Sequence, residues 1–363
     1  MLTGWAFFLE AVIKVVAVFS LLLTVVLVVV WMERKVVADM QNRIGPARAG
    51  PFGILQTVAD GMKLFFKESI TPRKAEFLPY IIAPAAALVP ALLIFLVVPI
   101  GRPFTLSIGG REVVISLQGT DLNVGILYIL GISSLAVYAV VLAGWSSGSK
   151  YPLLGAVRAA AQMISYEAAM GLALVPVVLF AGTTSLAALV AGQGGSYGGV
   201  QIFGWEMSLP AWNVVLVPSF VIFFIAGVAE TNRAPFDLVE AEQEIVGGFH
   251  TEYSGFRFAL FFLAEYINVF NISAITVIVF LGGWNGPDFG TPATIAWAFP
   301  ITWFLLKTFA LIFVFIWIRA TLPRMRYDQL MSFGWKRLIP VSLLWLALST
   351  VAIGIRRFGM PDF

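Results

Sequence analysis

The sequence predicts an all-α integral membrane protein, and three observations lead to this fold class. Hydrophobic residues make up 60% of the 363 residues and charged residues only 12%, whereas soluble domains carry about 25% charged residues. Eight apolar runs each approach the roughly 20 residues that cross a bilayer as a helix. The runs show no strict alternation, which favours helices over barrel strands. They cover residues 6–31, 77–100, 122–145, 157–181, 210–230, 256–281, 296–318 and 337–355.

Basic residues gather on one side of these spans. Most of the 23 lysine and arginine residues fall in the loops after the first, third, fifth and seventh spans. The positive-inside rule places such loops in the cytoplasm. We therefore expect a single polytopic domain over residues 1–363 with both termini on the outer side. The cytoplasmic loops are then about 32–76, 146–157, 231–255 and 319–336.

Cysteine and histidine usage limits the chemistry of the chain. The sequence has no cysteine and one histidine, His250. These counts exclude disulfides, thiolate zinc sites, iron-sulfur ligation and bis-histidine haem. No Lys/Arg run is typical of a nucleic-acid patch, so no nucleic-acid partner is expected. Any redox cofactor must sit on another chain, or the electron acceptor must be a diffusible lipid.

The first cytoplasmic loop predicts a helix that lies on the membrane surface. Residues 45–51 contain two Gly-Pro pairs, which disfavour helix, and an amphipathic segment follows them. A helix this short and polar should lie in the interface plane. It serves either as a membrane-surface prop or as a wall of a cavity that opens toward lipid, and Asp60 suits both roles. Its apolar face comprises Ile54, Leu55, Val58, Met62, Phe65 and Phe66, and its polar face Gln56, Asp60, Lys63 and Lys67.

Four of the charged residues within or at the end of apolar spans are candidates for function, because charge at membrane depth is expensive and usually functional. At 1.5 Å per residue, Glu167, Glu265 and Lys307 lie near the membrane midplane, in the fourth, sixth and seventh spans. Glu230 ends the fifth span at the cytoplasmic side. These residues can form a path from the cytoplasmic surface to the membrane centre. The alternative is static ion pairing in which Lys307 neutralises one glutamate, but three carboxylates exceed one lysine.

The fifth loop is acidic, which is unusual for a cytoplasmic loop. Pro235 disfavours helix at Ala234, so the fifth span should end there. Asp237 and Glu240 have the spacing of a capping box for a short helix, with Glu244 on the same face. Clustered carboxylates raise one another's pKa and can exchange protons near neutrality, which suggests proton uptake or a response to a charged intermediate. The acids are Glu230, Asp237, Glu240, Glu242, Glu244 and Glu252.

The outer loops have the composition of connectors. The glycine-rich stretch 192–199 follows no expected strand and does not match Gly-x-Gly-x-x-Gly, so a linker is expected there. No internal repeat of the kind found in inverted-repeat transporters is present.

Several long motifs occur in a fixed order along nearly the whole chain. They are Glu33-Arg-Lys with Gln41-Asn-Arg-Ile-Gly-Pro, Ala59-Asp-Gly-Met-Lys-Leu, Ser149-Lys-Tyr with Arg158-Ala-Ala-Ala-Gln-Met-Ile-Ser-Tyr-Glu, Glu230-Thr-Asn-Arg-Ala-Pro-Phe-Asp-Leu, Phe249-His-Thr-Glu-Tyr-Ser-Gly and Arg319-Ala-Thr-Leu-Pro-Arg-Met-Arg-Tyr-Asp-Gln-Leu-Met. Together they resemble the H subunit (mitochondrial ND-one type) of proton-translocating NADH-quinone oxidoreductase, respiratory complex I. Residues 239–244 depart from the Glu-Gly-Glu-Ser-Glu form of many members, but the acids remain.

This resemblance implies a subunit at the heel of the membrane arm, beneath the hydrophilic arm. Its spans and surface helix would form the entrance and lower part of a quinone chamber. Quinone would be the substrate, no cofactor would be bound by this chain, and FMN and iron-sulfur clusters would belong to partner subunits. The partners would be the hydrophilic-arm quinone-site subunits, neighbouring small membrane subunits and lipid of a bacterial plasma membrane.

The resemblance also assigns residues to two roles. The proton-coupling group comprises Glu167, Glu230, Glu265, Glu240, Glu242, Glu244 and Lys307. The quinone-binding group comprises Arg34, Arg43, Asp60, Arg233, Phe236 and Asp237.

Two other functions fit some of these features. A homologous membrane subunit of an energy-converting hydrogenase or a ferredoxin-linked quinone reductase would share part of the motifs. An independent secondary transporter could use the buried acids, although the absence of a repeat and the long cytoplasmic loops argue against it.

Overall fold

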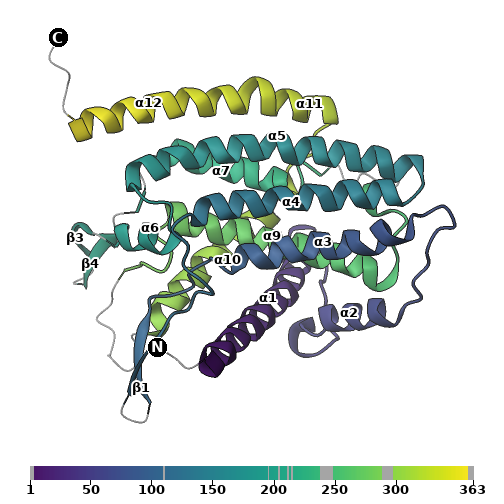
Figure 1. Cartoon of the computed structure of the whole chain (residues 1–363), viewed down its shortest axis with the longest axis horizontal. Coiled ribbons are helices and arrows are strands. Elements are labelled where there is room, and N and C mark those ends of the chain that lie inside the picture. The colour runs from purple at the N-terminus through teal and green to yellow at the C-terminus, as the bar shows by residue number, and fades with distance from the viewer. Residues whose placement is uncertain are drawn as a thin grey trace.

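A computed structural model describes residues 4–108, 111–194, 196–202, 205–210, 212–213, 216–237, 248–287 and 297–358. Over these ranges the chain is a bundle of long helices, which confirms the expected all-α membrane class (Figure 1). Seven helical stretches in the described residues are long and apolar enough to cross a membrane. They are α1 (Gly4–Met40), α3 (Phe77–Phe95), α4 (Gly125–Ser146), α5 (Lys150–Ala181), α9 (Gly255–Phe280), α10 (Ala298–Thr321), and the continuous run of α11 (Tyr327–Phe333), a π-helical turn (Gly334–Leu338) and α12 (Ile339–Phe358).

The fifth expected span corresponds to a shorter helix, α7 (Val217–Glu230), of 14 residues. At 1.5 Å per residue it is about 21 Å long, less than the roughly 30 Å hydrocarbon core. The count of eight spans therefore remains a prediction. The helix ends at Glu230, shortly before Pro235, as the helix-disfavouring effect of proline predicts.

Two short antiparallel hairpins lie at one end of the bundle. Strand β1 (Phe104–Ile108) pairs with β2 (Arg111–Ile115), and β3 (Ser196–Ile202) pairs with β4 (Trp205–Pro210). The expectation of a linker over 192–199 was therefore wrong from Ser196 onward, because antiparallel pairing satisfies the backbone groups of a glycine-rich segment as well as any other. A short helix, α6 (Leu186–Gly192), precedes β3.

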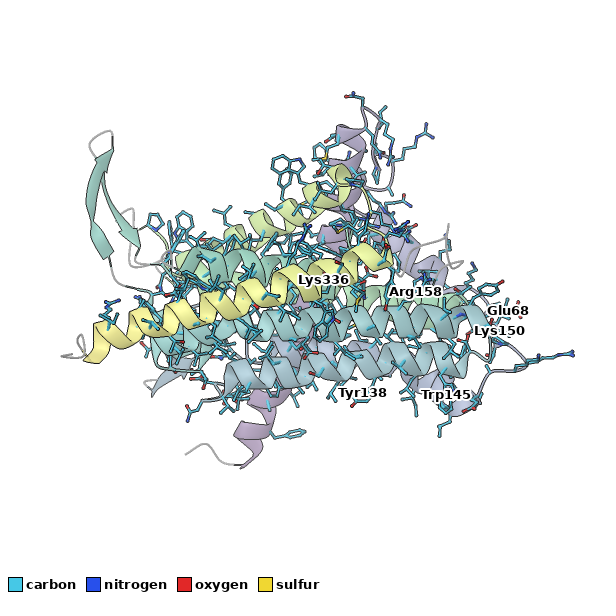
Figure 2. All side chains as sticks on the ribbon, turned by 90° about the horizontal axis from the view of Figure 1, so that it is seen from above. Glu68, Tyr138, Trp145, Lys150, Arg158 and Lys336 are labelled. Atoms are coloured by element: carbon cyan, nitrogen blue, oxygen red, sulfur yellow. The ribbon has the colours of Figure 1, made fainter. Side chains whose placement is uncertain are left out.

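The two ends of the bundle carry different elements. Both hairpins lie at one end, and α1 begins and α12 ends toward that same end (Figure 1). The surface helix α2 (Gln56–Phe66) lies toward the opposite end. We call these ends the hairpin end and the α2 end. In Figure 2, Glu68 and Lys150 project at the α2 end, whereas Tyr138 and Trp145 lie along the outer edge of α4.

Helix α9 is the centre of the bundle. In its most apolar stretch 78% of residues are buried, against 17% for the stretch that includes α12. Small residues let neighbouring helices approach α9 closely. A Cβ atom at Gly227 of α7 would lie 2.5 Å from Cγ2 of Ile272, so a larger residue at this crossing would displace the Ile272 side chain. The central place of α9 brings its polar residues close to α1, α7 and α10.

The expected amphipathic helix of the first loop is confirmed as α2. It packs beside the start of α9, where the Phe65 and Phe256 rings meet edge to face with centroids 5.3 Å apart. Most of its apolar face, including Met62 and Phe66, is exposed in the isolated chain. Helix α1 continues to Met40, so the Glu33-Arg-Lys part of the first motif is helical, whereas Gln41-Asn-Arg-Ile-Gly-Pro follows the helix.

Candidate functional site

The first part of the site joins α1 to the surface helix. Arg34 on α1 donates a hydrogen bond of 2.5 Å from Nη1 to Asp60 Oδ2 on α2. Gln56 Nε2 donates to the other oxygen at 3.2 Å. Burial raises the pKa of Asp60, but the hydrogen bonds and the positive charges of Arg34 and Lys63 outweigh it and hold the pKa below its usual value. Asp60 is therefore a fixed negative charge at neutral pH.

The second part is a chain of alternating charges within the bundle. Arg319 of α10 pairs with Glu33 of α1. Arg233, which follows α7, lies 3.8 Å from the same Glu33 oxygen through Nη1. Its Nε lies 3.0 Å from Glu265 Oε1 on α9. The Arg233 guanidinium also lies over the Tyr266 ring, 4.3 Å from its centroid, and its side chain is only 6% exposed.

Glu230 lies at the last turn of α7, beside this chain of charges. Its Oε2 atom is buried and has no hydrogen-bond partner within the described part of the protein. The neighbouring backbone is fixed by Gln162 of α5, a fully buried side chain. The Gln162 amide donates to the carbonyls of Ala229 at 2.7 Å and Phe236 at 2.8 Å. Gln162 therefore holds both sides of the Asn-Arg-Ala-Pro turn that positions Glu230 and Arg233.

Two cavities meet at Glu230. One has a volume of about 60 Å³ and is lined by Glu230, Glu265, Asn268 and His250 among others. The other has a volume of about 30 Å³ and runs from Glu230 and Asn268 past Ser133 to Val279. A cavity of about 10–15 Å³ already holds one water molecule when polar groups line it. Both cavities can therefore hydrate Glu230, and the first also reaches Glu265.

Glu167 lies in the middle of α5, next to the second cavity. Two adjacent serines of α4 face it: Ser134 Oγ donates to Glu167 Oε1, and Ser133 Oγ lies 3.4 Å from the same atom. Ser133 also lines the second cavity. The structure thus brings Glu265, Glu230 and Glu167 into one series joined by cavities and serine hydroxyls.

Lys307 lies apart from these acids. Its ammonium donates to the carbonyls of Leu281 at 2.7 Å, Gly283 at 2.9 Å and Asn285 at 2.5 Å, just beyond the end of α9. Among the described residues, no carboxylate forms an ion pair with it. The alternative in which Lys307 neutralises one of the three glutamates therefore does not describe this structure.

The remaining expected site residues are scattered. Arg43 is exposed and donates from Nε to Gln41 Oε1 at 2.7 Å. Phe236 is buried in the hydrophobic core, with its ring 5.4 Å from that of Tyr166. Asp237 is half-buried. Three acids of the fifth loop lie outside the described residues, namely Glu240, Glu242 and Glu244.

Sequence reasoning did not assign a role to several residues of the site. Glu33 and Arg319 were inside recognised motifs, but nothing in a single sequence shows that helices so far apart along the chain bring these two charges together. A signal did exist for Ser133 and Ser134, which form a polar pair inside an otherwise apolar span. Asn268 is a similar polar residue of the α9 span, one turn from Glu265.

The fold and the site define a multi-pass membrane protein with a series of partly buried charged residues between its helices. The sequence profile of the NADH dehydrogenase family matches residues 13–350, and the chain belongs to this family. A Frankia casuarinae protein, named as the H subunit of NADH-quinone oxidoreductase, is 53% identical over 343 residues, which cover 94% of this chain and 72% of that protein. A Frankia alni protein of the same name is 52% identical over 336 residues, or 92% of this chain and 70% of that protein.

Proposed function

We propose that the chain is the quinone-site membrane subunit of a proton-translocating NADH-quinone oxidoreductase. It forms the quinone entrance and chamber and couples quinone reduction to proton translocation. The observation that carries the proposal is the series in which Arg233 pairs with Glu265, one cavity joins Glu265 to Glu230, and a second cavity with Ser133 joins Glu230 to Glu167. The names of the similar Frankia proteins favour this function over a hydrogenase subunit or an independent transporter.

The quinone entrance lies between α1 and α2. A quinone has an apolar tail and a headgroup with two carbonyl oxygens, which accept hydrogen bonds. The exposed apolar face of α2 suits the tail, and Arg34 beside Asp60 offers donors for the headgroup. Arg43 is exposed within the same loop, and Arg233 lies behind α1 on the route inward.

Arg233 is the residue that transmits a change of charge at the quinone to the glutamates inside the bundle. It lies between Glu33 and Glu265, so a change of charge at the quinone alters how strongly the arginine holds each glutamate. A buried carboxylate oxygen without a hydrogen-bond partner, such as Glu230 Oε2, makes the ionised form costly, which favours a proton on Glu230. Water in the two cavities and the Ser134 hydroxyl can then carry a proton between Glu265, Glu230 and Glu167.

Electrons reach the quinone from other subunits. This sequence has no cysteine and one histidine, so it lacks the ligands of iron-sulfur clusters. In the proposed complex these clusters and FMN would be on partner chains. The hydrophilic-arm subunits at the quinone site would contact the α2 end, and small membrane subunits and lipid would cover the exposed sides of the bundle. The α2 end then faces the cytoplasm and the hairpin end the outer side of a bacterial plasma membrane.

Glu167→Gln and Glu230→Gln in the assembled complex test this function. Glutamine keeps the shape of the side chain but cannot carry a proton, so coupled turnover should fall by about tenfold or more. Quinone reductase rate and proton pumping are measured together in vesicles, with complex assembly checked on native gels.

The matched control is Glu10→Gln, which removes an exposed glutamate ion-paired with Lys14 and should change neither quantity. If both site variants assemble with a normal rate and a normal proton-to-electron ratio, the acidic series has only a structural role. Purification of the wild-type complex without NADH-oxidising partners would instead favour a hydrogenase-type or ferredoxin-linked assembly.

A further inference from the structure

The ammonium of Lys307 occupies a cage of backbone carbonyls at the hairpin end of α9. Its three N–H donors match the three carbonyls of Leu281, Gly283 and Asn285. The ammonium also lies over the Trp212 ring, 4.5 Å from its centroid. Only 9% of the residue is exposed, so the ammonium is buried here, and within the described ranges carbonyl dipoles rather than a carboxylate surround it.

The backbone that forms the cage depends on two glycines. Gly282 and Gly283 have φ values of 72° and 54°, in the left-handed region that glycine adopts without strain. This conformation turns the alternate carbonyls of residues 281, 283 and 285 toward one point beyond the last turn of α9. The C-terminal end of a helix carries partial negative charge, which further stabilises the cation at this position.

Side-chain amides close the same region. Gln193, after α6, donates to Ile278 O at 2.8 Å and accepts from Gly282 N at 3.0 Å. Asn213 Nδ2 donates to Val279 O at 2.7 Å, and Asn285 Nδ2 donates to Val190 O at 2.6 Å. These three amides connect α6, the segment before α7 and the end of α9 into one polar layer around Lys307.

This layer lies directly beyond the cavity that starts at Glu230. That cavity is lined by Asn268 at one end and by Val279 and Leu186 at the other. Along α9, residues 268 to 279 span about 16 Å. Most of its walls are aliphatic, and Val279 is only two residues from Leu281, the first carbonyl of the cage. A proton that left Glu230 toward the hairpin end would therefore approach the Lys307 charge.

We propose that Lys307 and its carbonyl cage form an electrostatic barrier that prevents protons from leaking through this subunit at the hairpin end. A buried fixed cation repels protons and other cations, as fixed positive charges do in selective channels. This inference rests on the proposed function, because it assigns the hydrated glutamates as a proton route. Protons taken up at the α2 end must then leave sideways toward neighbouring subunits rather than straight through this chain.

Passive proton leak of vesicles that contain the assembled complex tests the barrier. A pH step is imposed without NADH or quinone, and the decay of the gradient is followed with an internal pH-sensitive dye. Lys307→Gln removes the charge but keeps two donors for the carbonyls. The leak should rise roughly tenfold, since a unit charge about 10 Å away at an effective dielectric constant of about 20 changes a barrier by about that factor. Lys307→Arg keeps the charge and should leak as little as the wild type.

Two further variants separate charge from packing. Lys14→Gln removes a half-buried lysine that is ion-paired with Glu10 in the first turns of α1 and should leave the leak unchanged. Gln193→Leu removes one amide of the layer but keeps the cation, so its proton leak should also equal that of the wild type. A leak that is unchanged in Lys307→Gln, or that rises equally in Gln193→Leu, overturns the proposal. If Lys307→Gln does not assemble, Trp212→Leu is measured instead. This variant changes the surroundings of the cation without removing it, so the proposal requires its proton leak to stay as low as that of the wild type.

Because the leak is measured without turnover, its outcome does not depend on the Glu167 and Glu230 experiment. Normal pumping in those variants together with a raised leak in Lys307→Gln would retain the barrier and reject the acidic route. Loss of pumping in those variants with an unchanged leak in Lys307→Gln would retain the acidic route and reject the barrier.

Discussion

Arg233 shows how a single residue can link two regions of the molecule. Its guanidinium is buried between Glu33 and Glu265 and lies over the Tyr266 ring. Removing one partner of a buried ion pair typically costs about 3–5 kcal/mol, because the other charge stays buried without compensation. The arrangement is therefore stable only while all of its charges are balanced. A nearby quinone that gains negative charge on reduction would disturb that balance, which suits a residue that transmits a signal.

The Arg34–Asp60 pair is more exposed than the Arg233 pairs, so breaking it should affect quinone binding rather than stability. Exposed ion pairs contribute about 0–1 kcal/mol to stability, so Asp60→Asn should leave complex assembly intact. The apparent KM for quinone should rise, because Arg34 loses the partner that orients it toward the headgroup. NADH oxidation by artificial acceptors that bypass the quinone site should be unchanged. Equal loss of both activities would indicate failed assembly instead.

The pH dependence of this variant follows from the lowered pKa of Asp60. When the pKa of a carboxyl is lower in the folded state than in the unfolded state, its ionised form stabilises the fold. This stabilisation is complete at a pH above the unfolded-state pKa and is lost as the pH falls through the folded-state pKa. The difference in KM between wild type and Asp60→Asn should therefore be constant from about pH 5 to pH 9. A difference that disappears near pH 6 would contradict the assignment of Asp60 as a fixed charge.

Residue identity was easier to predict than residue pairing. The buried acids Glu167, Glu230 and Glu265 were predicted from their positions in apolar runs, because charge in such a run is rare and conspicuous. Their partners were not. Lys307 was considered as a neutralising charge since it was the one lysine at similar depth, but it contacts backbone carbonyls, which every residue has. Pairing depends on helix rotation and crossing, and a single sequence does not specify these.

At the scale of elements, the site is assembled around α9 and the turn after α7. Helix α9 supplies Glu265 from its interior, the carbonyl cage follows its last turn, and α7 ends at Glu230 against the buried Gln162. The 3.6-residue period and the Gly-Pro pairs were enough to predict α2, because an amphipathic pattern is a local property. Strand β3 was missed because its glycines lack the β-branched alternation from which strands are recognised. Strands β1 and β2 are only five residues each, too short to stand out between long apolar runs.

The exposed apolar face of α2 predicts contact with lipid or with the quinone tail. The cysteine-free chain allows a single cysteine with a spin label at position 62 or 63. The label at 62 should be reached by dissolved oxygen, which partitions into lipid, and the label at 63 by a water-soluble nickel complex. Met62→Asp should weaken quinone-dependent activity, since burying this side chain contributes about 1.5–3 kcal/mol. Lys63→Gln, on the polar face, is the matched control. Equal nickel accessibility at both positions would show that the face is turned to water.

The whole molecule is polarised from end to end. The α2 end carries the surface helix and most of the basic loop residues, whereas the hairpin end carries short strands and the closed polar layer around Lys307. This asymmetry was predictable from charge alone, because lysine and arginine counts are read directly from the sequence. The way in which α1, α9 and α10 converge on one ion-pair series was not, because it depends on contacts between segments hundreds of residues apart, such as Arg319 with Glu33.

The polarity leads to a prediction of membrane topology that also decides the number of spans. If α7 and the residues before it cross the membrane, eight spans place both termini on the outer side, and the α2 end is cytoplasmic. Single cysteines at positions 48 and 193, one at each end, would be labelled with a membrane-impermeant maleimide in intact cells and in inverted vesicles. Because Gln193 is buried, a second single-cysteine variant at the exposed neighbouring position 194 is labelled in parallel. We expect position 194 to react from outside and position 48 only in inverted vesicles. The reverse result would overturn the orientation. A cysteine at position 237 that reacts from the same side as position 194 would show that the segment 210–230 does not cross, leaving seven spans.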